Sequence, residues 1–273
     1  MSCPRWQAQS DPFDMLNDTT AIVNPESPEG SPPLPSLAVM VGSLPDLTTL
    51  CGCTGLNKAG FKSLITSRLY TNEARTFALT GPIIGAPYAV ILLETLIARG
   101  ARTILFLGWC GAISPKVNIG DVIVPTAAVI DEGTSLHYRM KTGDTVFPGN
   151  RVTGFITQQL TQQEIPFHTG AIWTTDAIYR ETRDRVIHFQ RQHTLAVEME
   201  LSALFTVGKF RDVEVGAVLV VSDSLASLSW QQGFTEKCFK TRRRAICDVI
   251  GRLCREQTGL RPAPAGKASN VHP

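Results

Sequence analysis

The feature that most constrains the fold is the alternation of short apolar segments with segments of helical periodicity. Helical spacing of apolar residues is found at 88–99 and 201–207, and a long C-terminal helix is predicted from near Gln232. Apolar segments of strand length occur at 36–41, 76–79, 103–107, 121–125, 171–174 and 215–221. This alternation predicts an α/β fold with a largely parallel or mixed sheet covered by helices on both faces.

The composition is that of a globular intracellular protein. The 26 Lys and Arg against 24 Asp and Glu leave no charge excess for binding nucleic acid or a membrane surface. Seven cysteines without a regular framework favour a reducing compartment, and Cys51 and Cys53 are interpreted as ordinary thiols near a turn. No apolar run approaches the roughly 20 residues of a membrane span, and the N-terminus does not resemble a signal peptide. We therefore expect a cytoplasmic protein.

The chain divides into one folded domain and two tails. Residues 1–35 and 261–273 are rich in Pro and Ser, a composition that cannot bury enough apolar surface to fold. They are predicted to be disordered, which leaves residues 36–260 as the domain. Within it, the basic run at 240–244 is interpreted as a solvated helix face, with a phosphate- or partner-binding patch as the alternative.

Four predicted strands end in small or acidic residues. Gly42, Gly81, Gly108 and the pair Ser222–Asp223 stand at these ends. Ligands of open α/β sheets bind beyond the carboxyl ends of the strands. These positions are therefore expected to form the rim of a pocket.

Three segments carry groups suited to chemistry, and each has a plain structural alternative. Gly108 allows backbone to approach a ligand, or it only serves a tight turn. Glu198 and Glu200 flank Met199 at the start of a helix, where they stabilise the helix N-terminus or accept hydrogen bonds from sugar hydroxyls. Asp223 is a helix N-cap, or a pocket acid whose pKa is raised by partial burial.

Together the order and spacing of these segments resemble the nucleoside phosphorylase family, which includes uridine phosphorylase, hexameric purine nucleoside phosphorylase and methylthioadenosine nucleosidase. The resemblance runs from Leu37 to the C-terminal helix. It implies a single-domain, three-layer α/β/α sandwich around a mixed sheet, and a homo-oligomer of dimers or hexamers. In some members a neighbouring subunit completes the site, and residues 131–138, which resemble the uridine phosphorylase branch, offer His137 as the candidate.

The resemblance also assigns roles to single residues. Met199 and Glu200, together with Glu198, correspond to the ribose-binding motif. Ser222 and Asp223 are similar to the motif of purine-handling members, which implies that Asp223 hydrogen-bonds or protonates N7 and that Ser222 lies on the base side. Arg180 is a further candidate for contacting the base, or it forms a surface ion pair.

The phosphate side departs from the family pattern. Phosphate needs amides, arginines and a hydroxyl, and the family places an Arg and a Ser or Thr around Gly108. This chain has Phe106 and Trp109 there, and Asp46 lies in the loop after Gly42 where an Arg is expected. Trp109 either stacks on a base or fills the phosphate site. Lys62 and Arg68 are the candidates for supplying a cation on the side of Gly42 and Gly108.

The function expected from the resemblance is that of a pentosyltransferase. It cleaves the N-glycosidic bond of a purine or uridine-type nucleoside to free base and ribose 1-phosphate, with inorganic phosphate as co-substrate. No other cofactor and no metal are expected. Two alternatives stay open: a phosphate-independent nucleoside hydrolase that uses Asp46 as the base, and a non-catalytic nucleoside-binding protein.

Overall fold

A computed structural model describes residues 21–256. The predicted C-terminal tail and residues 1–20 of the predicted N-terminal tail lie outside this range. Residues 21–35 contain no helix or strand, but Leu34 is buried in the core and its backbone N–H donates to the carbonyl oxygen of Arg99 at 2.6 Å.

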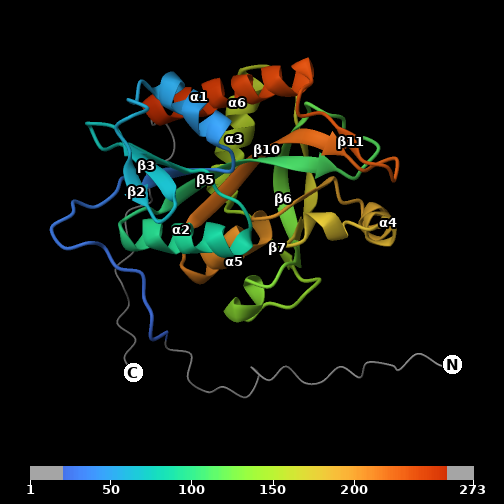
Figure 1. Ribbon diagram of the computed structural model, residues 1–273, viewed down its shortest axis with the longest axis horizontal. Coiled ribbons are helices and arrows are strands. Elements are labelled where there is room, and N and C mark those ends of the chain that lie inside the picture. The colour runs from blue at the N-terminus through green and yellow to red at the C-terminus, as the bar shows by residue number, and fades with distance from the viewer. Residues whose placement is uncertain (1–20, 257–273) are drawn as a thin grey trace.

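One mixed β-sheet forms the centre of the fold (Figure 1). Its strands are β1 (Leu37–Val41), β2 (Lys62–Leu64), β3 (Ser67–Thr71), β4 (Phe77–Gly81), β5 (Thr103–Ala112), β6 (Val122–Asp131), β7 (Thr145–Val146), β8 (His168–Thr175), β9 (Ala196–Glu198), β10 (Glu214–Ser224) and β11 (Gln231–Gln232). Parallel pairing joins β4, β1, β5 and β10, and also β6, β8 and β9. Antiparallel pairs β10–β6 and β5–β9 close five of these strands into a ring.

Helices cover both faces of the sheet. In Figure 1, α1, α3 and α6 lie on one side, and α2 and α5 lie on the other. The helices are α1 (Leu44–Thr54), α2 (Ala86–Ala98), α3 (Asn150–Gln162), α4 (Arg183–Arg191), α5 (Leu201–Phe210) and α6 (Lys237–Glu256), with short 3₁₀ helices η2 (Ser135–Tyr138) and η3 (Ile178–Arg180). The predicted three-layer α/β/α architecture is therefore confirmed.

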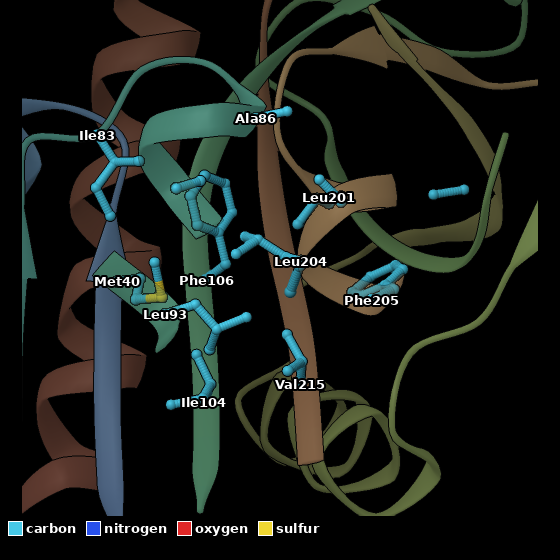
Figure 2. Packing of buried hydrophobic residues seen from close by; sticks show 14 of the residues in the cluster. Met40, Ile83, Ala86, Leu93, Ile104, Phe106, Leu201, Leu204, Phe205 and Val215 are labelled. Carbon is cyan, nitrogen blue, oxygen red and sulfur yellow. The ribbon is translucent and has the colours of Figure 1, made fainter. Parts of the chain in front are cut away.

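The core on the α2 and α5 side holds the central strands in place (Figure 2). Leu93 of α2 and Leu204 of α5 pack toward Ile104 and Phe106 of β5 and Val215 of β10. All five side chains are buried. Because β5 and β10 carry residues of the pocket at their carboxyl ends, this packing also fixes the pocket.

Several element boundaries differ from the sequence prediction. β5 continues past Gly108 to Ala112 because both its edges find partners there, β10 on one side and β9 on the other. β10 likewise extends through Asp223, so Asp223 is not a helix N-cap. The C-terminal helix begins at Lys237, since Gln231–Gln232 pair with β10 as a strand.

Cys51 and Cys53 are free thiols in the last turn of α1, directly before the turn at Gly55, which agrees with their predicted place near a turn. They pack on the side of the sheet that α6 covers. Across residues 21–256, no helix combines the length and the apolar character needed to cross a bilayer.

Replacing Leu93 with Ala is expected to lower the free energy of unfolding by about 2–5 kcal/mol, because it leaves a cavity in a fully buried position. Ile91 on the same helix is 51% exposed, so Ile91→Ala is the matched control, with a change of about 0.5 kcal/mol or less. Urea denaturation measures both changes. Equal losses in the two variants would contradict the packing shown in Figure 2.

Candidate active site

A pocket of about 290 Å³ opens at the carboxyl ends of β5 and β10, beside the junction of β9 and α5. Its volume is near the lower end of small-molecule sites, which span about 300–1,000 Å³. Its wall contains Gly42, Ser43, Ile83, Ile84, Phe106, Gly108, Trp109, Cys110, Gly111, Ile178, Glu181, Val197, Glu198, Met199, Glu200, Ser222, Asp223 and Phe234. Eight of the candidate residues predicted from the sequence therefore lie in one wall, although they come from distant segments of the chain.

Glu200 presents a carboxylate to the pocket at the start of α5. Its Oε1 accepts a 2.6 Å hydrogen bond from the backbone N–H of Gly85, whose φ of 81° is a conformation that glycine adopts without strain. Met199 is half-buried beside Glu200. This corner thus offers one fixed acceptor and an apolar thioether, which suits a sugar with hydroxyls on one edge.

Glu198 lines the same wall but is largely engaged by the protein itself. Its Oε2 accepts from the backbone N–H groups of Glu200 and Leu201, both at 2.8 Å, and its Oε1 accepts from the hydroxyl of Thr174. These bonds cap the first turn of α5. Burial raises the pKa of Glu198 and of Glu200, and the charge of Glu200 raises that of Glu198 further. Glu198 therefore fixes the turn that presents Met199 and Glu200.

Asp223 lines the same pocket from β10. Its Oδ1 accepts from the hydroxyl of Ser222 at 2.6 Å, and its Oδ2 accepts from Nε1 of Trp230 at 2.8 Å. Gly111 on β5 makes room for this carboxylate, because a Cβ atom there would lie 3.2 Å from Oδ2. Both carboxylate oxygens are thus held by donors of the protein.

Glu181 is a pocket residue that the sequence analysis missed. It follows η3 and lies in the wall with Asp223. Burial raises the pKa of Glu181 to about 7, and the charge of Asp223 adds to the effect. The only signal in the sequence was its position six residues after Thr175, the carboxyl end of β8.

Asp46 does not face the pocket, although it was the candidate base of a hydrolase. It is only 2% exposed, and its Oδ2 accepts from Nε1 of Trp109 at 2.6 Å and from the hydroxyl of Ser43 at 2.8 Å. Its Oδ1 accepts from Nε and Nη2 of Arg243 at 2.9 and 2.7 Å. Four donors thus hold this carboxylate. Asp46 serves as an internal counter-ion and has no free oxygen with which to activate water.

Arg243 is the second residue that the sequence analysis missed, because the basic run was interpreted as a solvated face. It lies on the buried stripe of α6, four residues after Phe239 and three before Ile246, a spacing that indicates an inward position. Its guanidinium lies 4.4 Å from the ring centroid of Trp109. The ion pair with Asp46 therefore sits behind Trp109, outside the pocket wall.

Trp109 separates the pocket from this ion pair. Arg243 covers its ring, and the ring of Phe239 meets it edge-on at 5.1 Å. Its Nε1 is bonded to Asp46. Of the two predicted roles, this arrangement favours filling the phosphate side, because the tryptophan is fixed against the protein.

Four predicted residues lie outside the pocket wall. Lys62 and Arg68 belong to the β2–β3 hairpin, where the guanidinium of Arg68 lies 5.0 Å from the ring centroid of Phe61. His137 is on η2, and Arg180 is exposed at the end of η3. None of the four belongs to the pocket wall of one chain.

The charge of the pocket is strongly one-sided. Glu181, Glu198, Glu200 and Asp223 contribute four carboxyl groups, and no Lys, Arg or His from residues 21–256 stands in the wall. Burial of several carboxyls together disfavours the charged forms. The wall of one chain is therefore suited to a ligand rich in donors and poorly suited to an anion.

Asp46→Asn is expected to lower the free energy of unfolding by about 3–5 kcal/mol, because it leaves the guanidinium of Arg243 nearly buried without its counter-charge. Arg243→Met and the double variant complete a double-mutant cycle. The double variant should lose less than the sum of the two single losses, as contacting residues do. Strict additivity in urea denaturation would show that the pair is not coupled.

The comparison with protein-family models identifies one match. The model of the phosphorylase superfamily matches residues 36–254, which is most of the described chain.

Relatives and solved structures agree with this match. The chain is 29% identical to a guanosine phosphorylase of Halorubrum lacusprofundi, in an alignment that covers 68% of this chain and 76% of that protein. It is 33% identical to a uridine phosphorylase of Treponema pallidum, in an alignment that covers 50% of this chain and 57% of that protein. Its fold is similar to that of uridine phosphorylase from Vibrio fischeri, with a TM-score of 0.69 and 22% sequence identity. The superposition covers 81% of this chain and 93% of the Vibrio chain.

The fold is also similar to that of purine nucleoside phosphorylase from Toxoplasma gondii in complex with immucillin-H, with a TM-score of 0.68 and 19% sequence identity. The superposition covers 82% of this chain and 92% of the Toxoplasma chain. The family that the sequence motifs predict is thus confirmed. The chain belongs to the phosphorylase superfamily.

Proposed function

We propose that this chain cleaves the N-glycosidic bond of a nucleoside, with a purine nucleoside as the preferred substrate. The observation that carries the proposal is that Glu200, Met199 and Asp223, the residues matched to the ribose and base motifs, line one pocket. In this proposal the sugar is held at Glu200 and the base lies toward Asp223. The names of the relatives, which include a guanosine phosphorylase and purine and uridine phosphorylases, support the same class of reaction.

In this proposal the residues of the pocket wall have separate roles in binding the sugar and releasing the base. Glu200 accepts hydrogen bonds from sugar hydroxyls, and Met199 packs on the apolar face of the sugar. Asp223 and Ser222 assist the departure of the base. The bond breaks toward an oxocarbenium-like sugar, as in other glycosidic chemistry, and the acceptor attacks from the side of Gly42 and Gly108.

Inorganic phosphate is the first candidate for the acceptor, with ribose 1-phosphate as the product and no other cofactor. This proposal requires a cation that the pocket wall of one chain does not hold. We therefore propose a cytoplasmic homo-oligomer in which Lys62, Arg68 or His137 of a neighbouring copy completes the phosphate side. Phe61 and Ile65, both exposed and apolar, flank Lys62 on that hairpin and suit such a contact.

Water is the second candidate for the acceptor, and the closed phosphate side favours it. Arg243 is the cation nearest to Trp109, and its guanidinium is already paired with Asp46. A dianion in the pocket would therefore face carboxyl groups without compensation.

Free base released from purine and pyrimidine nucleosides, with and without phosphate, tests both candidates. Phosphate-dependent release supports a phosphorylase, and release without phosphate supports a hydrolase. Asp223→Ala should lower turnover of a purine nucleoside by about 10²–10⁴-fold, the usual contribution of a group that assists proton transfer. Tight nucleoside binding without release would instead indicate a binding protein.

Glu200→Gln removes the charge that accepts the sugar hydroxyls while it keeps the shape of the side chain. Hydrogen bonds to charged groups contribute about 1.5–3 kcal/mol, so kcat/KM for a ribonucleoside should fall about 10- to 100-fold. A 2′,3′-dideoxynucleoside lacks these hydroxyls and serves as the control. A loss of the same size with both substrates would argue against the sugar-binding role.

A further inference from the structure

The departing base must gain a proton at the end of the pocket where Asp223 lies. As the N-glycosidic bond breaks, its electron pair stays on the base, and protonation of a ring nitrogen neutralises that charge. The titratable groups of the pocket wall are Cys110, Glu181, Glu198, Glu200 and Asp223. One of them has to hold the proton before the bond breaks.

Three of these groups are poorly placed to give a proton to the base. Glu198 caps α5, and Glu200 is bonded to Gly85 and is the proposed partner of the sugar. Cys110 is buried, and burial raises the pKa of its thiol. The choice lies between the two remaining carboxyls, Glu181 and Asp223.

Asp223 is engaged at both oxygens. Trp230 Nε1, which can only donate, bonds to Oδ2, and the hydroxyl of Ser222 donates to Oδ1. Both oxygens of Asp223 therefore already accept a hydrogen bond from the protein, and neither is oriented to donate to a base.

Glu181 is in the opposite situation. Its carboxyl takes part in no hydrogen bond and no ion pair with any residue between 21 and 256, yet it lines the pocket beside Asp223. A half-buried carboxyl without donors, next to a fixed negative charge, is stabilised in its protonated form. Ile178 and Phe234 make that part of the wall apolar.

We propose that Glu181 is a catalytic acid that gives its proton to the departing base, an inference that rests on the proposed function. In this step the O–H bond of the Glu181 carboxyl breaks and an N–H bond forms on the base. The electron pair of the glycosidic bond stays on the base, and the acceptor bonds to the sugar carbon. Glu181 is left as a carboxylate and is reprotonated from solvent after release.

The groups that face Glu181 define its dependence on pH. Asp223 of β10 raises the pKa of Glu181, and burial raises it more, to about 7. Glu198 and Glu200 are the other carboxyls of the wall, and no cation from residues 21–256 stands there. Because the acid must carry its proton, kcat/KM should be high below pH 7 and fall as the pH rises through that value.

The test compares guanosine with 7-methylguanosine, using Glu181→Gln in the full chain. The methylated base carries a positive charge in the nucleoside and leaves without needing a proton. Glu181→Gln should therefore lower kcat/KM for guanosine by about 10²-fold or more, the usual contribution of a general acid, and leave that for 7-methylguanosine unchanged. The fall of kcat/KM above pH 7 should disappear in this variant.

Two further variants sharpen the comparison. Asp184→Asn removes an exposed carboxylate three residues away, outside the pocket wall, and should behave as the wild type. Asp223→Asn removes the charge that raises the pKa of Glu181, so the residual activity should fall at a lower pH than in the wild type.

The results distinguish failure of the Glu181 inference from failure of the proposed function. If Glu181→Gln lowers turnover of guanosine and 7-methylguanosine equally, Glu181 only binds the base or supports the fold, and the inference is wrong. Unchanged guanosine turnover in Glu181→Gln overturns it as well. If the wild type releases no base from either nucleoside, the proposed function itself fails.

Discussion

The parallel pairing of β5 with β10 is the interaction on which the rest of the structure depends. It runs from Thr103–Glu214 to Ala112–Ser224, with a single irregularity next to Asp223. This register places Trp109 beside Val220 and Gly111 beside Asp223. Both strands are buried along almost their whole length and pack alternate side chains into the two hydrophobic clusters on opposite faces of the sheet. A slip by one residue would exchange the two sets of side chains and disrupt both clusters. The same packing that stabilises the sheet therefore sets the geometry of the pocket.

The carboxyls of the pocket wall are held by different kinds of contact. Backbone N–H groups donate to Glu198 and Glu200, so the position of these carboxylates follows directly from the backbone. Side chains of Ser222 and Trp230 hold Asp223. The position of Asp223 therefore also depends on the segment between β10 and α6 that carries Trp230.

The surroundings of Asp46 show how one internal carboxylate can occupy a cluster of donors. Asp46 binds Ser43, Trp109 and Arg243, a hydroxyl, an indole N–H and a guanidinium, which are groups of the kind that bind anions. These donors are therefore already paired within the protein. Trp109 then closes the space between this ion pair and the pocket, and the pocket wall of one chain is left with carboxyls alone.

The sequence by itself determined the fold class, six of the strands and eight of the residues in the pocket wall. Apolar strands ending in Gly42 and Gly108, and the segment Glu198–Met199–Glu200, are local patterns whose meaning depends on a few neighbouring residues. Asp223 was predictable for the same reason, because it ends a buried strand. The carboxyl end of β5 and the start of α6 could not be predicted, because strand pairing with residues distant in the chain sets these boundaries.

Tertiary structure alone decided the roles of Glu181, Arg243 and Asp46. Asp46 and Arg243 are 197 residues apart, and only the packing of α1 on α6 brings a guanidinium to the carboxylate. The pKa of Glu181, which follows η3, is raised by burial and by the charge of Asp223 on β10. The physical reason is the same in each case. Charge, burial and hydrogen bonding depend on distances in space, and sequence patterns report only on neighbours along the chain.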